Sequence, residues 1–89
     1  MRTITLDLER MTSVPALHKY LRSALALPAH YGANLDALYD CLTEIAEPTQ
    51  IIVPANVTDN EKLGCYGEQL LQVLQDAAEE NEILQVTVK

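Results

Sequence analysis

Residues 28–45 read PAHYGANLDALYDCLTEI and carry a clear turn followed by a clear helix pattern. Pro28 ends whatever precedes it, and Gly32 permits the positive-φ geometry of a tight bend. Asn34 is a good N-cap, because its side-chain oxygen can accept from the free amides of the first helical turn. Beyond it, aliphatic side chains recur at helical spacing and form one apolar stripe: Leu35, Leu38, Leu42 and Ile45. The pattern predicts a helix that packs on a core through this stripe.

The opposite side of the same helix carries two aspartates one turn apart. Asp36 and Asp40 repel each other at this spacing, which costs the helix about a few tenths of a kcal/mol. Tyr39 lies between them, and His30 and Tyr31 precede the helix. Aromatic side chains beside charged ones are typical of interface hot spots, so this side favours a surface for a cationic partner. On composition alone, a merely solvated helix face explains the aspartates equally well.

Length and charge limit the class of protein. At 89 residues and 9.9 kDa the chain is one domain, residues 1–89, because a second core would be too small to stand. The net charge of −7 argues against binding nucleic acid, whose phosphates require basic side chains. The charge is uneven: residues 1–22 hold four basic and two acidic side chains, and residues 23–89 hold two basic and eleven acidic ones. Such an asymmetry speeds encounter with a basic protein, although acidic surfaces also simply keep proteins soluble.

The N-terminus alternates polar and apolar residues, unlike the apolar block of a signal peptide. No apolar run approaches the length of a membrane span. We therefore expect a cytoplasmic protein with no membrane partner. The two cysteines, Cys41 and Cys65, have no metal-ligand spacing, and Cys41 is expected beside the apolar stripe as a small hydrophobe.

Three segments have the pattern of β-strands. Apolar residues alternate with polar ones at Ile4, Leu6 and Leu8, and again over residues 84–88. Residues 50–53 read QIIV, a continuous run that is typical of an interior strand buried on both faces.

Helical patterns lie between these strands. Thr12 or Ser13 can cap the first helix, and His18 lies off its apolar stripe and is expected in solvent. Further helices are predicted from Asn34, over about 57–63 and over about 65–81. Strands joined by helical crossovers are most naturally parallel, with right-handed connections. The element order therefore predicts an α/β fold, with a three-stranded parallel sheet in the order 2-1-3 packed with three to four helices.

Enzyme chemistry has little support in the sequence. The three glycines are scattered and form no phosphate-binding loop, and no serine or cysteine has the setting of a nucleophile, although the fold could bring His30 near Cys41. Asp36 and Asp40 could act as an acid–base pair or as ligands of a divalent metal, but no third ligand is indicated. We predict no catalytic residue, metal or cofactor. A small metal-dependent enzyme that uses Asp36 and Asp40 is kept as a further hypothesis, behind the two binding functions given below.

The chain resembles the barstar family, intracellular inhibitors of the extracellular ribonuclease barnase. The resemblance covers nearly the whole chain and is densest at LALP (25–28), YG (31–32), NLDAL (34–38) and DCLT (40–43), with a second block around residues 71–80. It implies a three-stranded parallel sheet with helices and a non-catalytic function. In that function, the second helix and the loop before it plug the active site of a basic secreted ribonuclease, one to one.

The resemblance also implies roles for individual residues. Asp40 is the principal mimic of the RNA phosphate, received by arginines and a histidine of the nuclease, and Asp36 pairs with further basic groups. The remaining implied partner-binding residues come from the loop, the same helix and the last helix: His30, Tyr31, Gly32, Asn34, Leu35, Ala37, Tyr39, Thr43, Ile45, Asp76 and Glu80.

Three aromatic positions of the family are changed in this chain. His30 stands where the family has a tyrosine, and Tyr39 and Ile45 stand where it has tryptophans. The charged centre is kept while the aromatic rim is altered, so the identity of the target nuclease is open. The alternative is an interaction or regulatory module with the same fold that binds a different basic partner.

Overall fold

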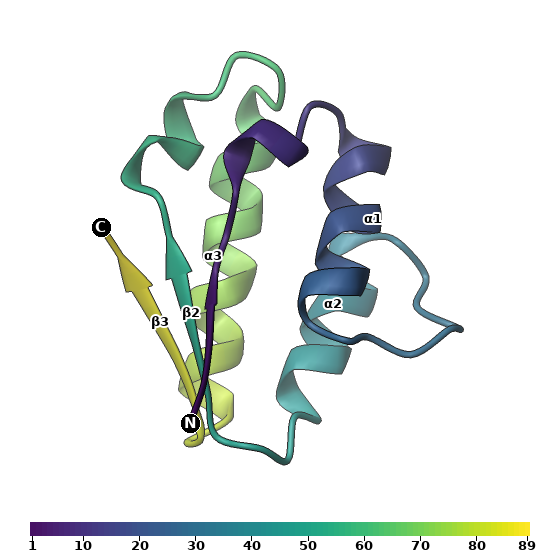
Figure 1. Cartoon of the computed structure of the whole chain (residues 1–89), viewed down its shortest axis with the longest axis vertical. Coiled ribbons are helices and arrows are strands. Elements are labelled where there is room, and N and C mark those ends of the chain that lie inside the picture. The colour runs from purple at the N-terminus through teal and green to yellow at the C-terminus, as the bar shows by residue number, and fades with distance from the viewer.

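The computed structural model describes all of residues 1–89 and has two layers, a three-stranded sheet and a layer of helices (Figure 1). The strands are β1 (Arg2–Thr5), β2 (Thr49–Val53) and β3 (Leu84–Val88). The helices are α1 (Val14–Ala24), α2 (Leu35–Thr43) and α3 (Cys65–Glu80), with the short 3₁₀ helices η1 (Leu8–Arg10) and η2 (Ala55–Asp59). In Figure 1, α3 runs along the strands, and α1 and α2 form the right-hand part of the molecule.

The strand order is β1-β2-β3, so the predicted order 2-1-3 is wrong. All three strands are parallel, as predicted, and Ile51 of the central strand β2 pairs with Ile4 on one side and Val86 on the other. Two right-handed crossovers that step in the same direction place their helices on one face of the sheet. The order 2-1-3 would place them on opposite faces. The element order along the chain does not specify the direction of the second step, which explains the error.

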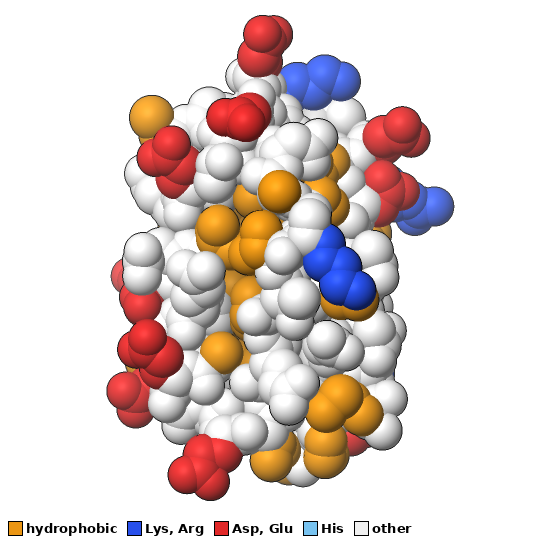
Figure 2. All heavy atoms as spheres, turned by 90° about the vertical axis from the view of Figure 1, so that its left-hand side faces the viewer, with side chains coloured by type: hydrophobic (Ala, Val, Ile, Leu, Met, Phe, Trp, Pro, Cys, Tyr) orange, Lys and Arg blue, Asp and Glu red, His pale blue; other side chains and the backbone are white.

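Helices cover only one face of the sheet. Along β2, Thr49, Ile51 and Val53 are fully buried, whereas Gln50 and Ile52 are partly exposed. The prediction that this strand is buried on both faces is therefore wrong, although its interior position is confirmed. Figure 2 shows the side of the molecule where β3 lies, with hydrophobic side chains in a central band and acidic side chains at the margins.

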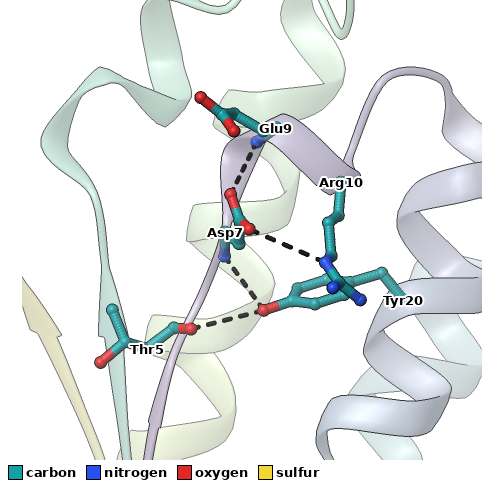
Figure 3. Close-up of polar contacts among 5 residues, drawn as sticks. All are labelled: Thr5, Asp7, Glu9, Arg10 and Tyr20. Carbon is teal, nitrogen blue, oxygen red and sulfur yellow. Dashed lines mark hydrogen bonds and ion pairs between the residues drawn. The ribbon is translucent and has the colours of Figure 1, made fainter.

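Tyr20 joins the first strand to the first helix (Figure 3). Its hydroxyl accepts from the Asp7 N–H at 3.0 Å and donates to the Thr5 carbonyl at 3.4 Å. Asp7 also accepts from the Glu9 N–H at 3.0 Å and so caps η1. Arg10 lies 3.8 Å from the Asp7 carboxylate, an exposed ion pair of the kind that contributes little to stability. The tyrosine is therefore the main polar link between β1 and α1.

The predicted helix caps are confirmed. Ser13 Oγ accepts from the Ala16 N–H at 3.2 Å, and Asn34 Oδ1 accepts from the Ala37 N–H at 2.8 Å. The helix predicted over about 65–81 is confirmed as α3.

No α-helix forms over residues 57–63. The short η2 ends at Asp59, and Asn60 then organises a turn: its side chain accepts from the Lys62 N–H and its carbonyl accepts from the Gly64 N–H, both at 2.9 Å. Gly64 has a φ of 57°, which glycine adopts without steric cost, and α3 begins directly after it. The local hydrogen bonds of Asn60 thus replace the predicted helix.

His18 is buried in the core, so the prediction that it lies in solvent is wrong. Only 2% of its surface is exposed. Its Nδ1 lies 2.6 Å from the Tyr31 hydroxyl and its Nε2 lies 2.5 Å from the Tyr66 hydroxyl. Burial lowers the pKa of the imidazole. The buried side of α1 is wider than its aliphatic stripe, because the loop before α2 and the start of α3 both reach this side of the helix.

The C-terminus of α2 is held by a side chain that follows α3. Asn81 Nδ2 donates to the carbonyls of Leu42 and Ile45, both at 3.0 Å, and Asn81 Oδ1 accepts from the Ile83 N–H at 3.2 Å. Carbonyls at helix ends lack partners within the helix and need such donors. Asn81 therefore joins the ends of α2 and α3 to the start of β3.

Replacing Asn81 by Asp is expected to lower the free energy of unfolding by about 1–3 kcal/mol, because a carboxylate cannot donate to the two carbonyls of α2. Asp keeps the size of the side chain and its acceptor for the Ile83 N–H, so the loss reports on the donors. Urea unfolding followed by circular dichroism measures the change. The matched control is Asn56→Asp, an exposed position in η2, and equal stability of the two variants would contradict the role given to Asn81.

His18 is expected to make stability depend on pH. The imidazole titrates near pH 6.5 in an unfolded chain, and burial lowers its pKa in the folded one. Between these two pKa values the unfolded chain binds more protons, so the free energy of unfolding falls as the pH is lowered below about 6.5. His18→Gln should flatten the stability profile between pH 7 and pH 5 relative to the wild type, measured by urea unfolding. In the control variant His30→Gln, which changes an exposed histidine, stability should depend on pH as in the wild type. If the stability of His18→Gln also depended on pH as in the wild type, the expectation would be contradicted.

Candidate partner-binding site

The loop before α2 is closed by local hydrogen bonds. The Tyr31 N–H donates to the carbonyl three residues earlier at 3.0 Å, and Asn34 Nδ2 donates to the Gly32 carbonyl at 3.2 Å. Positive φ falls on Ala33, at 53°, and not on Gly32 as predicted. Gly32 has a different role, since a Cβ at this position would lie 3.3 Å from the Cβ of Ala37, a tight contact. The glycine therefore lets the loop lie close against the first turn of α2.

Helix α2 presents its two aspartates to solvent. Leu38 and Leu42 are fully buried, and Asp36 and Asp40 are exposed on the other side, as the pattern predicts. The Thr43 hydroxyl donates to the Asp40 backbone carbonyl at 2.9 Å and is therefore engaged within the helix. The one ion pair of the chain lies at η1, so neither aspartate is neutralised by a cation of the protein itself.

Helix α3 packs beside α2 and adds carboxylates on the same side of the molecule. Burial raises the pKa of the Tyr39 hydroxyl, and the charges of Glu80, Asp76, Asp40 and Glu79 raise it further. Carboxylates from both helices therefore lie near enough to the tyrosine to act on its hydroxyl. Glu79 is not among the residues predicted to bind a partner. The only feature of the sequence that indicates such a role is its place beside Glu80 in the last turn of α3. We call the exposed carboxylates of α2 and of the C-terminal part of α3 the acidic surface: Asp36, Asp40, Asp76, Glu79 and Glu80.

A hollow of about 220 Å³ lies between the loop and α2. Its lining combines the loop with one side of the helix: His30, Tyr31, Gly32, Ala37, Asp40, Cys41 and Glu44. Five residues predicted to bind a partner thus meet around one hollow. Glu44 was missed, and its signal was its position one turn after Asp40 on the same helix face. The hollow therefore carries two carboxylates beside two aromatic rings.

The thiol in the wall of this hollow is not activated. Burial raises the pKa of Cys41, and the charges of Glu44 and Asp40 raise it further. A thiol that stays protonated near neutral pH is a weak nucleophile. His30 lines the same hollow but forms no hydrogen bond with Cys41, so the two do not make a nucleophile–base pair. Both cysteines are free, and Cys65 is exposed at the start of α3.

Eight predicted residues do not line the hollow, and two of these are largely occupied by packing. Leu35 and Ile45 are half-buried and pack against the core. Ile45 also lines a separate hollow of about 350 Å³ together with Arg2 and Leu27. Of the three positions where the family aromatics are changed, His30 lines the hollow with Asp40, and Tyr39 has a pKa raised by carboxylates of both helices.

No three His, Cys, Asp or Glu side chains come together in a way that could hold a metal ion, so Asp36 and Asp40 have no third ligand. No helix combines the length and the apolar character that crossing a bilayer requires.

Similarity to known proteins extends over the whole chain. The model of the family described as Barstar (barnase inhibitor) matches residues 1–89. A protein of Bacillus subtilis (strain 168) named "Putative ribonuclease inhibitor YrdF" is 38% identical over 81 residues, which cover 90% of this chain and 89% of that protein. The family match includes the loop, α2 and the acidic end of α3. The chain belongs to the barstar (barnase inhibitor) family.

Proposed function

We propose that the protein inhibits a barnase-type ribonuclease in the cytoplasm by filling its active site with α2 and the preceding loop, in a one-to-one complex. The observation that carries the proposal is the acidic surface, whose carboxylates are exposed and paired with no cation of the chain. Family membership and the name of the relative favour the same class of target. In this role the protein is an inhibitor and catalyses no reaction.

The chemistry of the target explains why carboxylates suit this role. A ribonuclease active site binds phosphate and is therefore cationic. Arginine and lysine bind carboxylates through the same charge-assisted hydrogen bonds that they offer to phosphate. The resemblance to the family implies that Asp40 is the residue that would enter the phosphate site, and its place at the border of the hollow next to His30 and Tyr31 is compatible with that role. Asp36 lies one turn earlier on the helix and would reach further basic groups of the nuclease.

Rigid placement would make the acidic surface an effective competitor of RNA. Asn34 caps the start of α2 and Asn81 holds its end, while Leu38 and Leu42 are buried beneath it. Little conformational freedom is left to lose on binding, which favours affinity. Repulsion between Asp36 and Asp40 lowers the stability of α2 in the free protein, and cations of the nuclease would relieve this repulsion in the complex.

The remaining predicted residues would surround this charged centre. Tyr31, Gly32, Asn34 and Ala37 would contact the nuclease next to Asp40. Asp76 and Glu80 would extend the charge onto α3. Positions at the margin of the surface would adjust the fit to a given target: His30, Leu35, Tyr39, Thr43 and Ile45.

Replacing Asp40 by Asn is expected to weaken inhibition by about 100-fold or more, because the nuclease cations lose their charged acceptor within a desolvated interface. The assay measures cleavage of RNA by a purified barnase-type ribonuclease against inhibitor concentration. Asp59→Asn is the matched control, since Asp59 is exposed in η2 at the other end of α3. We expect this variant to inhibit like the wild type. Equal inhibition by the two variants, or no inhibition of any microbial ribonuclease by the wild type, would refute the proposal; specific binding of a basic protein that is not a nuclease would favour the interaction-module alternative.

The charges on α3 are expected to act mainly on the rate of association. The double variant Asp76→Asn with Glu80→Gln should slow association about 3- to 10-fold at low salt, because the attraction of these carboxylates to the cationic nuclease steers the encounter over roughly a Debye length. The difference should shrink as salt is raised. Stopped-flow mixing with the nuclease measures the rate. Asp59→Asn with Glu61→Gln removes the same charge near η2 and should change the rate less; an equal effect would mean that only the net charge matters.

A further inference from the structure

We propose that Tyr66 of α3 is a positioning residue for the partner-binding site: through His18 it holds Tyr31, and with it the loop of residues 28–33. Only the role of the loop in binding a nuclease rests on the proposed function. The hydrogen bonds that carry it belong to the free protein and can be tested without a nuclease.

The three side chains come from three separate elements and form one chain of hydrogen bonds. The His18 imidazole is in the middle, 2% exposed, and comes from α1. Its Nε2 lies 2.5 Å from the hydroxyl of Tyr66, and its Nδ1 lies 2.6 Å from the hydroxyl of Tyr31. Each phenol ring has its centroid 5.8 Å from that of the imidazole, and the ring of Tyr66 meets it edge-on. Both nitrogens of a buried ring are therefore used to join α3 to the loop.

The chemistry of the imidazole makes the two ends of this chain depend on each other. A neutral histidine has one N–H donor and one nitrogen acceptor. One tyrosine hydroxyl must therefore donate to the ring while the other accepts from it. Burial raises the pKa of Tyr31, and the neighbouring Tyr66 and Cys41 raise it further, so its hydroxyl stays protonated. If Tyr66 loses its hydroxyl, a buried ring nitrogen loses its partner and the orientation of the ring is no longer fixed from that side.

The loop has few other polar links to the rest of the protein. The Tyr31 N–H and the Gly32 carbonyl both bond within the loop or to the adjacent cap residue Asn34. The hydroxyl of Tyr31 makes the only hydrogen bond that joins residues 28–33 to α1 or α3. Tyr31 also lines the hollow beside Asp40. The buried ring of His18 thus connects Tyr66 of α3 to Tyr31 at the proposed interface.

The test compares Tyr66→Phe with Tyr20→Phe in the free protein. Each variant keeps the aromatic ring and loses one engaged hydroxyl, and the Tyr20 hydroxyl bonds Asp7 and Thr5 instead of His18. In the wild type, one ring nitrogen of His18 is protonated and the other is not, so their ¹⁵N resonances should be well separated. Tyr66→Phe should bring these resonances together and speed amide hydrogen exchange over residues 29–33 by about tenfold. Tyr20→Phe should leave both unchanged.

A double-mutant cycle separates positioning from a loss of overall stability. If both hydroxyls act through His18, Tyr31→Phe should also loosen the loop, and adding Tyr66→Phe to it should produce much less than the product of the two single effects. Unchanged His18 resonances and unchanged loop exchange in Tyr66→Phe would overturn the inference. Additive effects in the cycle would overturn it as well.

The nuclease assay is a separate arm. Where the wild type inhibits the ribonuclease, Tyr66→Phe should weaken inhibition about 3- to 10-fold although Tyr66 is not among the predicted contacts, and Tyr20→Phe should not. Inhibition unaffected by Tyr66→Phe, with a loosened loop, would overturn the link to the partner-binding site. A wild type that inhibits no ribonuclease would instead overturn the proposed function, while the free-protein readouts would still decide whether Tyr66 positions the loop.

Discussion

The packing of α2 against α3 is the interaction on which the candidate site depends. Leu42 of α2 and Leu74 and Ala77 of α3 are fully buried, and Asn81 closes the end of the pair. Burying one leucine contributes about 1.5–3 kcal/mol, whereas a like-charge pair one turn apart costs only about 0.2–0.5 kcal/mol. The apolar contact between the helices can therefore carry five exposed carboxylates on their outer sides. Without it the carboxylates would separate, and the acidic surface would not exist as a single feature.

Local patterns in the sequence were sufficient for the parts of the site that depend on near neighbours. The cap at Asn34, the outward-facing Asp36 and Asp40, and the extent of α3 are all decided within one or two helical turns. Hydrogen bonds between residues two to four apart decide them as well. Where another local arrangement competed, the prediction failed, as it did when Asn60 closed a turn in place of the helix expected over 57–63.

The errors of larger scale arose where a distant segment decides the outcome. Periodicity in β2 says nothing about which face the second crossover will cover, so both the strand order and the exposure of Ile52 were predicted wrongly. His18 was expected in solvent because it lies off the aliphatic stripe of α1. Its burial is decided by Tyr31 and Tyr66, which are 13 and 48 residues away. No pattern within α1 contains that information, and polar residues at the border of a stripe are therefore the ones that sequence reasoning places least well.

The division between charged centre and altered rim has a consequence for specificity under the proposed function. Any active site built to bind phosphate is cationic, so Asp40 and Asp36 would attract many nucleases without distinguishing among them. Discrimination then has to come from groups that fit one target and exclude another. Glu44 and His30 meet in the hollow beside Asp40, and the pKa of Tyr39 is raised by carboxylates of both helices, whereas Ile45 lines the other hollow with Arg2 and Leu27. The choice of nuclease would therefore be made mainly by His30, Tyr39 and Glu44, around a centre whose charge is general.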